Sequence, residues 1–391
     1  MKKFVKVMCM ALVLVMAMGC FAACGGEKNY AANNTSYKIG LSGPLTGGAA
    51  VYGIAVKNSA QMAVDEINAA GGLNGVMFEL VMLDDKHDST NIATNYAALY
   101  EGGMQVSLGT VTTAPGLEYT TFAAEDNVFF LTPSASGDDI PGGHGYQMCF
   151  ADGDQGSAAA TYVNANYAGK TIGIFYKSDD PYSKGIYDKF VASLDESVTT
   201  VVTSFSDANA TTFTTQIDTL KNCEFVFMPI YAEPAALFMT QAKNVMNANA
   251  VYYGCDGFDG IGSIDGFDIN AVPQKVSMLS HFDSNATEGA AKSFIDKYVA
   301  KYGAETLNQF GASAYDCVYA IFGAMKVAQE ANPDSVYVTM SASDLCDVLK
   351  GQFDGGFTFE VGATGENVKW NADGSVKKEA KEAVIKDFSA Q

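Results

Sequence analysis

Two short loops carry the hydroxyl side chains that could bind a small anion. The first contains Thr112 and Thr113 just ahead of Pro115, and the second contains Ser134 and Ser136. Each loop follows a short apolar run that we expect to form a strand. Thr is a good N-cap residue and Pro suits the first turn, so the first loop predicts a helix N-terminus. Hydroxyls beside free backbone N–H groups predict an anion site there.

Three further polar side chains follow strands expected later in the chain, namely Tyr182, Tyr231 and Asp256. Open parallel sheets bind ligands beyond the carboxyl ends of their strands, so these side chains and the hydroxyl loops should face one another. Hydroxyl donors on one side and a carboxylate with phenols on the other match the two charges of a zwitterion. Ordinary capping, packing or solvation is the alternative explanation for each residue taken alone.

The composition excludes several classes of function. All 24 basic residues are Lys, and against 44 acidic residues they leave a net charge of −20, which repels nucleic acid. Without Arg, no guanidinium clamp can hold a carboxylate or a phosphate. The three His are far apart, and the sequence contains no nucleophile elbow and no phosphate, dinucleotide or calcium motif. We therefore expect no enzyme activity, metal, cofactor or nucleic-acid partner.

The N-terminus is typical of an exported protein. Three Lys among the first six residues precede an apolar run, 7–21, and then Ala-Ala-Cys24. These features predict a signal peptide, 1–23, and resemble the cleavage site of bacterial lipoproteins, in which the Cys is lipidated. A non-lipidated signal peptide with an incidental Cys is the alternative, and Cys20 is a poorer second candidate. The polar residues 24–36 should form a flexible tether.

Apolar runs alternate with amphipathic helical stretches from residue 37 onward. This alternation predicts α/β lobes with parallel sheets covered on both faces. It restarts near residue 151, so two lobes lie in series within the 391 residues, and the mostly helical tail should complete both. We expect the first lobe to contain 37–150 and about 281–353, and the second to contain 151–280 and about 354–391.

Three stretches are distinctive: KIGLSGPLTG at 38–47, AVDEINAAGGLNG at 63–75 and LTPSAS at 131–136. With Asp154-Gln-Gly and Tyr182, they resemble the leucine/isoleucine/valine-binding protein family, the periplasmic substrate-binding proteins of ATP-driven amino-acid importers. The resemblance extends from residue 37 to nearly the C-terminus. It implies a type I periplasmic binding protein fold, with two doubly wound parallel-sheet lobes joined by a multi-strand hinge.

The resemblance also assigns roles in the first lobe. Thr113, with Thr112 beside it, matches a Ser of the family that binds the ligand α-carboxylate. Ser134 and Ser136 match loop positions that bind the carboxylate and the ammonium. Tyr52 matches an aromatic residue of the same lobe.

In the second lobe, Tyr182 and Tyr231 match tyrosines that close over the ligand. Asp256 matches an acid, commonly Glu, that pairs with the α-ammonium, and its shorter side chain leaves the preferred ligand side chain open. A first-lobe disulfide of well-known members is lost, because its positions fall near His87 and at Thr112. The cysteines beyond Cys24 are widely spaced, so we predict no essential disulfide while leaving one pair open: Cys149, Cys223, Cys255, Cys317 and Cys346.

These features predict a lipid-anchored receptor on the extracytoplasmic face of the cell membrane. It would pass a small amino acid, branched-chain or otherwise neutral, to the permease and ATPase subunits of an importer. An amide or a short peptide is the alternative ligand. An amino-acid or amide sensor subunit with the same fold is the alternative function, and an exported enzyme would need a nucleophile or metal set that we do not find.

Overall fold

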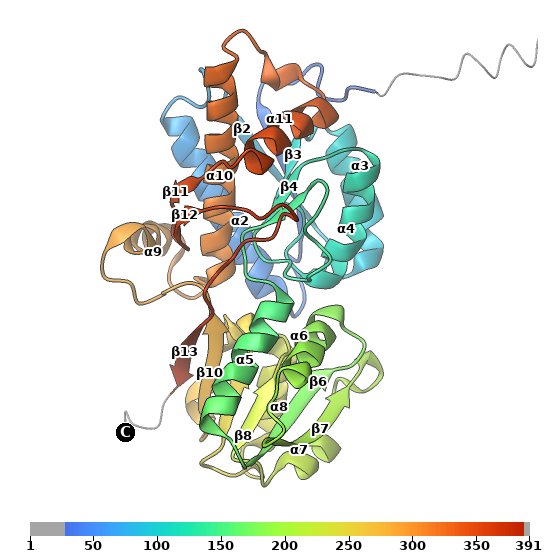
Figure 1. Ribbon diagram of the computed structural model, residues 1–391, viewed down its shortest axis with the longest axis vertical. Helices are drawn as coiled ribbons and strands as arrows, with labels where there is room; N and C mark the ends of the chain where they lie inside the picture. Colours follow the sequence, from blue (N-terminus) through green and yellow to red (C-terminus); the bar gives the residue numbers. More distant parts are fainter. Residues whose placement is uncertain (1–27, 387–391) are drawn as a thin grey trace, which may run out of the picture.

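Short apolar runs of the sequence form two separate sheets, one in each lobe of the molecule (Figure 1). The computed structural model describes residues 28–386, so the expected signal peptide and Cys24 lie outside the described residues. The first sheet has parallel strands in the order β2-β1-β3-β4-β5. Their bounds are β1 Tyr37–Gly43, β2 Phe78–Asp84, β3 Val106–Ser107, β4 Phe130–Thr132 and β5 Gly145–Gln147.

Helices cover both faces of the first sheet. The run that leads into β4 alternates between the faces, because Phe129 and Leu131 pack in one core cluster while Val128 and Phe130 pack in another. The helices α3 and α4 contribute to the second of these clusters, and α2 and α10 to the first. The helices of this lobe are α2 Ala50–Ala69, α3 Ile92–Glu101, α4 Thr113–Glu125, α9 Gly289–Tyr302, α10 Gln309–Ala331 and α11 Ala342–Asp354.

Close packing of α2 against α10 depends on a glycine. A Cβ at Gly311 would lie 2.7 Å from the Ser59 hydroxyl and 3.1 Å from the Ala55 carbonyl oxygen. The missing side chain therefore lets the start of α10, which borders the other lobe, approach α2 directly.

The second sheet has the order β13-β10-β9-β8-β6-β7, in which β13 is antiparallel to β10 and the other pairs are parallel. The strands are β6 Thr171–Lys177, β7 Thr199–Phe205, β8 Phe225–Met228, β9 Val251–Gly254, β10 Lys275–Ser280 and β13 Lys381–Lys386. The helices are α5 Asp152–Asn166, α6 Pro181–Ala192, α7 Thr214–Leu220 and α8 Ala232–Ala242. Two α/β lobes with parallel sheets confirm the expected fold class.

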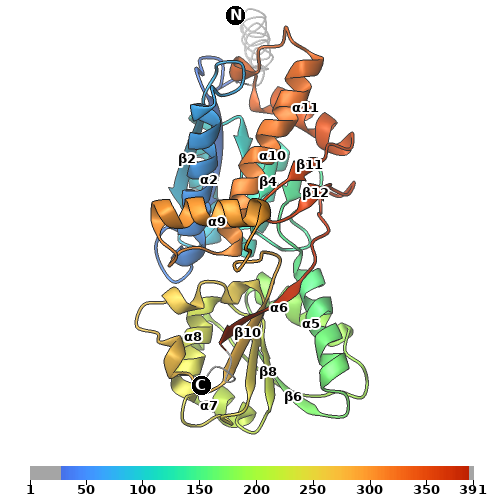
Figure 2. The same ribbon diagram turned by 90° about the vertical axis from the view of Figure 1, so that its left-hand side faces the viewer.

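The described chain passes between the lobes three times, after β5, after β10 and before β13 (Figure 2). The last crossing lies later in the chain than expected. We predicted that the second lobe resumes at about residue 354, but the structure places the segment after that residue on the first lobe. The hairpin of β11 (Phe359–Val361) and β12 (Glu366–Val368), with Trp370 after it, packs on the first lobe. Trp370 Nε1 donates to the Gln147 carbonyl at 2.7 Å. The Trp370 ring also packs on the Phe353 ring of α11, with centroids 4.5 Å apart. These contacts hold the segment on the first lobe, so only β13 joins the second sheet.

The expected tether of residues 24–36 is also only partly correct. Asn34 Nδ2 donates to the Gly103 carbonyl at 2.8 Å, and Asn29 Nδ2 donates to the Thr339 carbonyl at 3.0 Å. Ala31 between them is buried. Residues 29–36 therefore pack against the first lobe, because two asparagine side chains donate hydrogen bonds to backbone carbonyls of that lobe. The polar composition of the segment gave no sign of these contacts.

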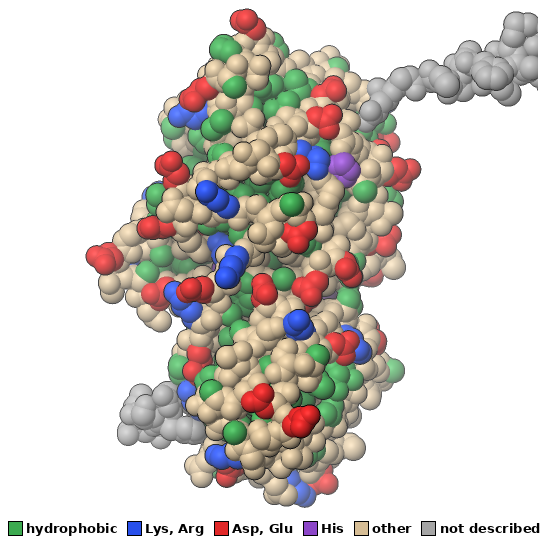
Figure 3. All heavy atoms as spheres, in the orientation of Figure 1, with side chains coloured by type: hydrophobic (Ala, Val, Ile, Leu, Met, Phe, Trp, Pro, Cys, Tyr) green, Lys and Arg blue, Asp and Glu red, His purple; other side chains and the backbone are tan. Residues whose placement is uncertain are grey.

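The face of the molecule in Figure 3 shows acidic side chains spread over both lobes with Lys interspersed. This distribution agrees with the net charge of −20. Among the described helices, none has an apolar stretch of the length needed to cross a membrane.

Candidate functional site

The two lobes meet around a small cavity at the carboxyl ends of their strands. Its volume is about 10 Å³, which is room for about one water molecule. Seven of the eight side chains proposed as ligand-binding from the sequence line it, and Thr113 lies next to the lining residue Thr112. The lining residues are Tyr52, Val111, Thr112, Ser134, Ser136, Tyr182, Tyr231, Asp256 and Phe310.

The first-lobe wall is formed by the start of α4 and the loop after β4. Thr112 is the N-cap residue of α4, with extended backbone at φ −119° and ψ 154°. Its hydroxyl does not cap the helix, because it bonds to His87 Nδ1 at 2.9 Å. The hydroxyl of Thr113 is buried and has no hydrogen-bond partner among the described residues. An unpaired donor at a helix N-terminus is suited to a carboxylate.

The second-lobe wall contains a buried carboxyl group directly after β9. Asp256 Oδ1 accepts a hydrogen bond from the Tyr182 hydroxyl at 2.7 Å, and that hydroxyl accepts one from Gly257 N at 2.9 Å. Asp256 Oδ2 is buried without a partner among the described residues. Burial raises the pKa of this carboxyl from 3.8 to about 7, although the hydrogen bond from Tyr182 opposes the shift.

A second buried carboxyl group, Asp152, was missed by the sequence analysis. It is the first residue of α5 and is 3% exposed, and its Oδ1 has no partner among the described residues. Burial, followed by the nearby charge of Asp256, raises its pKa well above the ordinary value, against a hydrogen bond from Ser136. Asp152 and Asp256 therefore place two unsatisfied carboxyl oxygens in one desolvated region, an environment that favours a bound cation.

Three tyrosines form the aromatic part of the site. The rings of Tyr182 and Tyr231 stack with centroids 4.5 Å apart, and Tyr52 lies 5.6 Å from Tyr231. The Tyr52 hydroxyl, from α2 of the first lobe, donates to the Gly257 carbonyl at 2.6 Å and accepts from Ala232 N at 2.8 Å. Tyr52 thus connects the lobes directly across the cavity.

His87 and Thr112, near which the family resemblance led us to expect a lost disulfide, are joined by a hydrogen bond. The five described cysteines are free and buried. Within residues 28–386 no group of three or more His, Cys, Asp or Glu could hold a metal ion.

Comparisons with known proteins agree with this architecture. The family model described as periplasmic binding protein matches residues 36–369. The leucine-, isoleucine-, valine-, threonine- and alanine-binding protein of Pseudomonas aeruginosa is 27% identical over 331 residues, which are 82% of this chain and 86% of that protein. The Leu/Ile/Val-binding protein BraC3 of Rhizobium johnstonii is 32% identical over 226 residues, which are 56% and 61% of the two chains.

Two solved structures are also similar. The branched-chain amino acid transporter substrate binding protein LivJ of Streptococcus pneumoniae, in complex with isoleucine, is 26% identical with a TM-score of 0.77, and covers 90% of this chain and 98% of its own. The leucine binding protein LivK of Thermotoga maritima shares the fold, with 22% identity and a TM-score of 0.75 over 90% of this chain and 96% of its own.

Proposed function

This chain belongs to the family of leucine/isoleucine/valine-binding periplasmic proteins, and we propose that it is a lipid-anchored receptor that captures an amino acid between its lobes. It would deliver that ligand to the permease and ATPase subunits of an ATP-driven importer. The family is one of solute-binding proteins, and its relatives bind branched-chain amino acids for transport.

The observation that carries the proposal is the set of buried polar atoms without partners around the site. Carboxyl oxygens of Asp152 and Asp256 have no partner among the described residues, and neither does the hydroxyl of Thr113. An α-amino acid presents an ammonium and a carboxylate close together, so one ligand satisfies both sets. Tyr182, Tyr231 and Tyr52 would cover it. Thr112 would complete the carboxylate side, and Ser134 and Ser136 would bind the carboxylate and the ammonium.

Capture requires movement of the lobes. A cavity of about 10 Å³ is far smaller than an amino acid, so the lobes must separate for the ligand to enter. The three chain crossings provide a hinge for this motion. Small-angle scattering should show a smaller radius of gyration with saturating ligand than without it.

The direct test is a thermal-shift screen against the twenty amino acids and their deaminated keto-acid analogues. A ligand that binds only the folded protein raises the unfolding midpoint by mass action. We expect one or a few amino acids to raise it and the keto acids not to. If no amino acid raises the midpoint, or the keto acids raise it more, the proposal is wrong.

Thr113→Ala should weaken binding by about 1 to 3 kcal/mol, because the ligand carboxylate would lose a hydrogen bond in a buried site. Calorimetry measures this difference. Thr121→Ala is a matched control, since Thr121 is an exposed threonine on the same helix. If the two variants bind the ligand with equal affinity, Thr113 does not bind the ligand carboxylate.

Affinity should fall as the pH is lowered through about 7. The pKa of the Asp256 carboxyl is raised to about 7, and once protonated this group cannot pair with an ammonium. Each pH unit below that value should weaken binding by up to about tenfold. By the same shift, the closed ligand-free form gains stability at low pH and loses it as the pH rises from about 4 through about 7. Calorimetry from about pH 5 to about pH 8 tests the predicted fall in affinity, and an affinity that does not change with pH would contradict it.

The proposed anchor rests on Cys24. Replacing it, as in Cys24→Ser, should release the protein from membranes during cell fractionation, because a lipid-modified N-terminus could no longer form. Continued association with the membrane fraction would count against lipidation at this residue.

A further inference from the structure

The segment that precedes the first strand is held to the first lobe by two amide side chains. Asn34 is 9% exposed, and its Nδ2 donates to the Gly103 carbonyl at 2.8 Å and to Gln105 Oε1 at 3.3 Å. Gln105 Nε2 donates in turn to the carbonyls of Tyr337 and Met340, both at 2.8 Å. A Cβ at Gly103 would lie 2.6 Å from Asn34 Oδ1, so glycine gives the amide room. Asn34 and Gln105 therefore form a clamp between the segment and the loop that follows α10.

The attachment continues toward the N-terminus as far as Asn29. Asn29 Nδ2 donates to the Thr339 carbonyl at 3.0 Å, and Asn29 Oδ1 accepts from Ala31 N at 2.9 Å. The Tyr30 ring packs edge-on against the Tyr100 ring of α3, with centroids 5.3 Å apart. Ala31 is 2% exposed. Burial and hydrogen bonds therefore fix the segment from its first few described residues onward.

This attachment lies at the end of the first lobe that faces away from the cavity. The parallel strands of the first sheet bring their carboxyl ends to the cavity, whereas residues 29–36 precede the amino end of β1 and residues 102–105 precede that of β3. The helix α10 begins at the lobe boundary, and its 23 residues span about 35 Å (Figure 1). The loop at 332–340 therefore reaches the same end. We call the surface formed by these three segments the outer pole of the first lobe.

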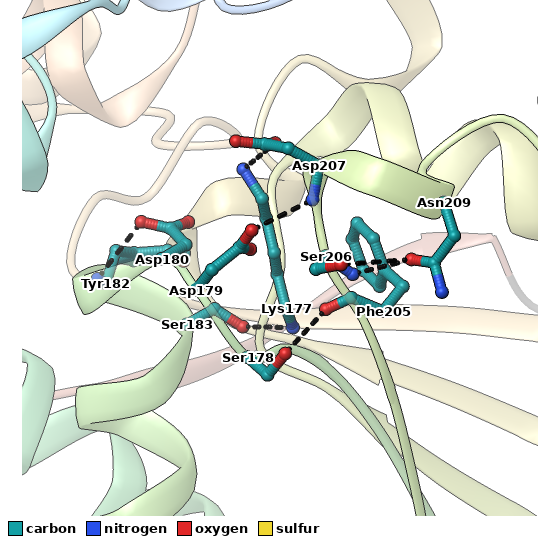
Figure 4. Close-up of polar contacts among 10 residues, drawn as sticks. All are labelled: Lys177, Ser178, Asp179, Asp180, Tyr182, Ser183, Phe205, Ser206, Asp207 and Asn209. Carbon is teal, nitrogen blue, oxygen red and sulfur yellow. Dashed lines mark hydrogen bonds and ion pairs between the residues drawn. The ribbon is translucent and has the colours of Figure 1, made fainter.

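The second lobe is arranged in the opposite direction. Figure 4 shows the carboxyl ends of β6 and β7, where Lys177 Nζ lies 2.7 Å from Asp207 Oδ1 and both side chains extend toward the first-lobe ribbons. The amino ends of these strands therefore form the other end of the molecule. Val245, between α8 and β9, lies at that end and is 51% exposed. Since β1 and β6 have seven residues each, the two ends lie on the order of 45 Å apart.

The attachment leaves little free chain after the proposed anchor. Asn29 is the fifth residue after Cys24, and five fully extended residues span at most about 18 Å. If residues 24–36 were all free, the same estimate would allow more than about 40 Å. A lipid on Cys24 therefore keeps the outer pole close to the bilayer only because the segment from Asn29 onward is attached.

We infer that the outer pole of the first lobe faces the lipid surface in the anchored receptor, and that the clamp of Asn34 and Gln105 sets this orientation. The inference rests on the proposed lipid anchor and adds the surface that meets the membrane. The acidic side chains spread over both lobes in Figure 3, with a net charge of −20, favour a second lobe that stands away from anionic lipid. The cleft is then separated from the bilayer by the length of β1, about 23 Å.

Energy transfer to the membrane tests the orientation. The lipidated protein is purified from cells and reconstituted in vesicles of anionic lipid whose headgroups carry an acceptor dye with a transfer distance shorter than the molecule. A donor dye is attached at Val336→Cys or, as the matched control, at Val245→Cys. Val336 is 62% exposed and belongs to the loop of the outer pole, and the five described cysteines are buried, so the introduced thiol is labelled selectively.

The label at residue 336 should lose most of its emission to the membrane acceptor, and the label at residue 245 should keep nearly all of its emission. Equal transfer from the two positions would overturn the inference, because the anchored protein would then have no preferred end at the lipid.

A longer tether tests the role of the attachment. A flexible Gly-Ser insertion of about twenty residues between Gly26 and Glu27 leaves every described residue unchanged and lets the outer pole move away from the lipid. Transfer from residue 336 should fall. Asn29→Ala combined with Asn34→Ala should have the same effect, and its unfolding midpoint shows whether the protein remains folded. If transfer from residue 336 is unchanged in the protein with the insertion, the short tether does not set the orientation and the inference is wrong.

Failure of the anchor and failure of the orientation are distinguishable. If the protein purified from cells carries no lipid and does not bind vesicles, the proposed anchor is wrong and the inference is wrong with it. If the lipidated protein binds vesicles but transfers equally from both labels, only the orientation is wrong. Amino-acid binding, measured separately, is independent of both results.

Discussion

Asp256→Asn should weaken amino-acid binding by about 2 to 5 kcal/mol, because the ammonium of the ligand would then be buried without its countercharge. The substitution keeps the shape of the side chain, and its amide oxygen can still accept from the Tyr182 hydroxyl. The empty protein should fold normally, since burial already favours a neutral group at this position, as the raised pKa of about 7 indicates. Loss of affinity would therefore report on the ligand and not on folding.

Calorimetry on Asp256→Asn and on Asp268→Asn separates the local effect from a general change of charge. Asp268 is an exposed acid of the same lobe that caps a short helical turn, a role that Asn also performs. Its substitution should leave affinity unchanged. Asp256→Asn that binds as tightly as the wild type, or a wild type that prefers the keto acid, would refute the amino-acid assignment and favour a carboxylate or amide ligand.

Most of the fold could be predicted because its signals are local. Alternating apolar runs and helical stretches indicate a parallel sheet in each lobe without any knowledge of tertiary contacts. The strands β5 and β10 were not predicted, since β5 has only three residues in a glycine-rich stretch and neither is flanked by a clear periodic pattern. The hairpin near Trp370 was assigned to the wrong lobe, because its position depends on where aromatic rings are buried.

The residues of the candidate site likewise fall into two groups: those that a local sequence pattern suggests and those that only the folded chain reveals. Thr112, Ser134 and Asp256 follow strands, and the topology of parallel sheets brings such residues together, so a sequence pattern was sufficient to suggest them. Asp152 follows a chain crossing and is the first residue of α5, and the sequence analysis assigned no role to it. Only the folded chain shows that it is buried near Asp256. Its carboxyl oxygen without a partner is a tertiary property that no local pattern records.

Tyr52→Phe should weaken ligand binding by about 2 to 4 kcal/mol through its effect on closure. In the closed form the Tyr52 hydroxyl is bonded to the Gly257 carbonyl and to Ala232 N, both in the other lobe. Without the hydroxyl, both backbone groups would remain buried and unpaired when the lobes meet, whereas in the open form water can satisfy them. The cost therefore falls on the closed state, which is the state that holds the ligand.

Calorimetry and small-angle scattering on Tyr52→Phe distinguish closure from general destabilisation when Tyr119→Phe is measured beside it. The Tyr119 hydroxyl is equally buried, but it donates to the Ser107 hydroxyl at 2.6 Å within the first lobe. Tyr119→Phe should lower the unfolding midpoint and leave affinity nearly unchanged. Tyr52→Phe should lose affinity and need more ligand to reach the smaller radius of gyration. If Tyr52→Phe closes and binds as the wild type does, the two bonds across the cavity do not control closure, and the desolvation of Asp152 and Asp256 by the ligand must supply the coupling instead.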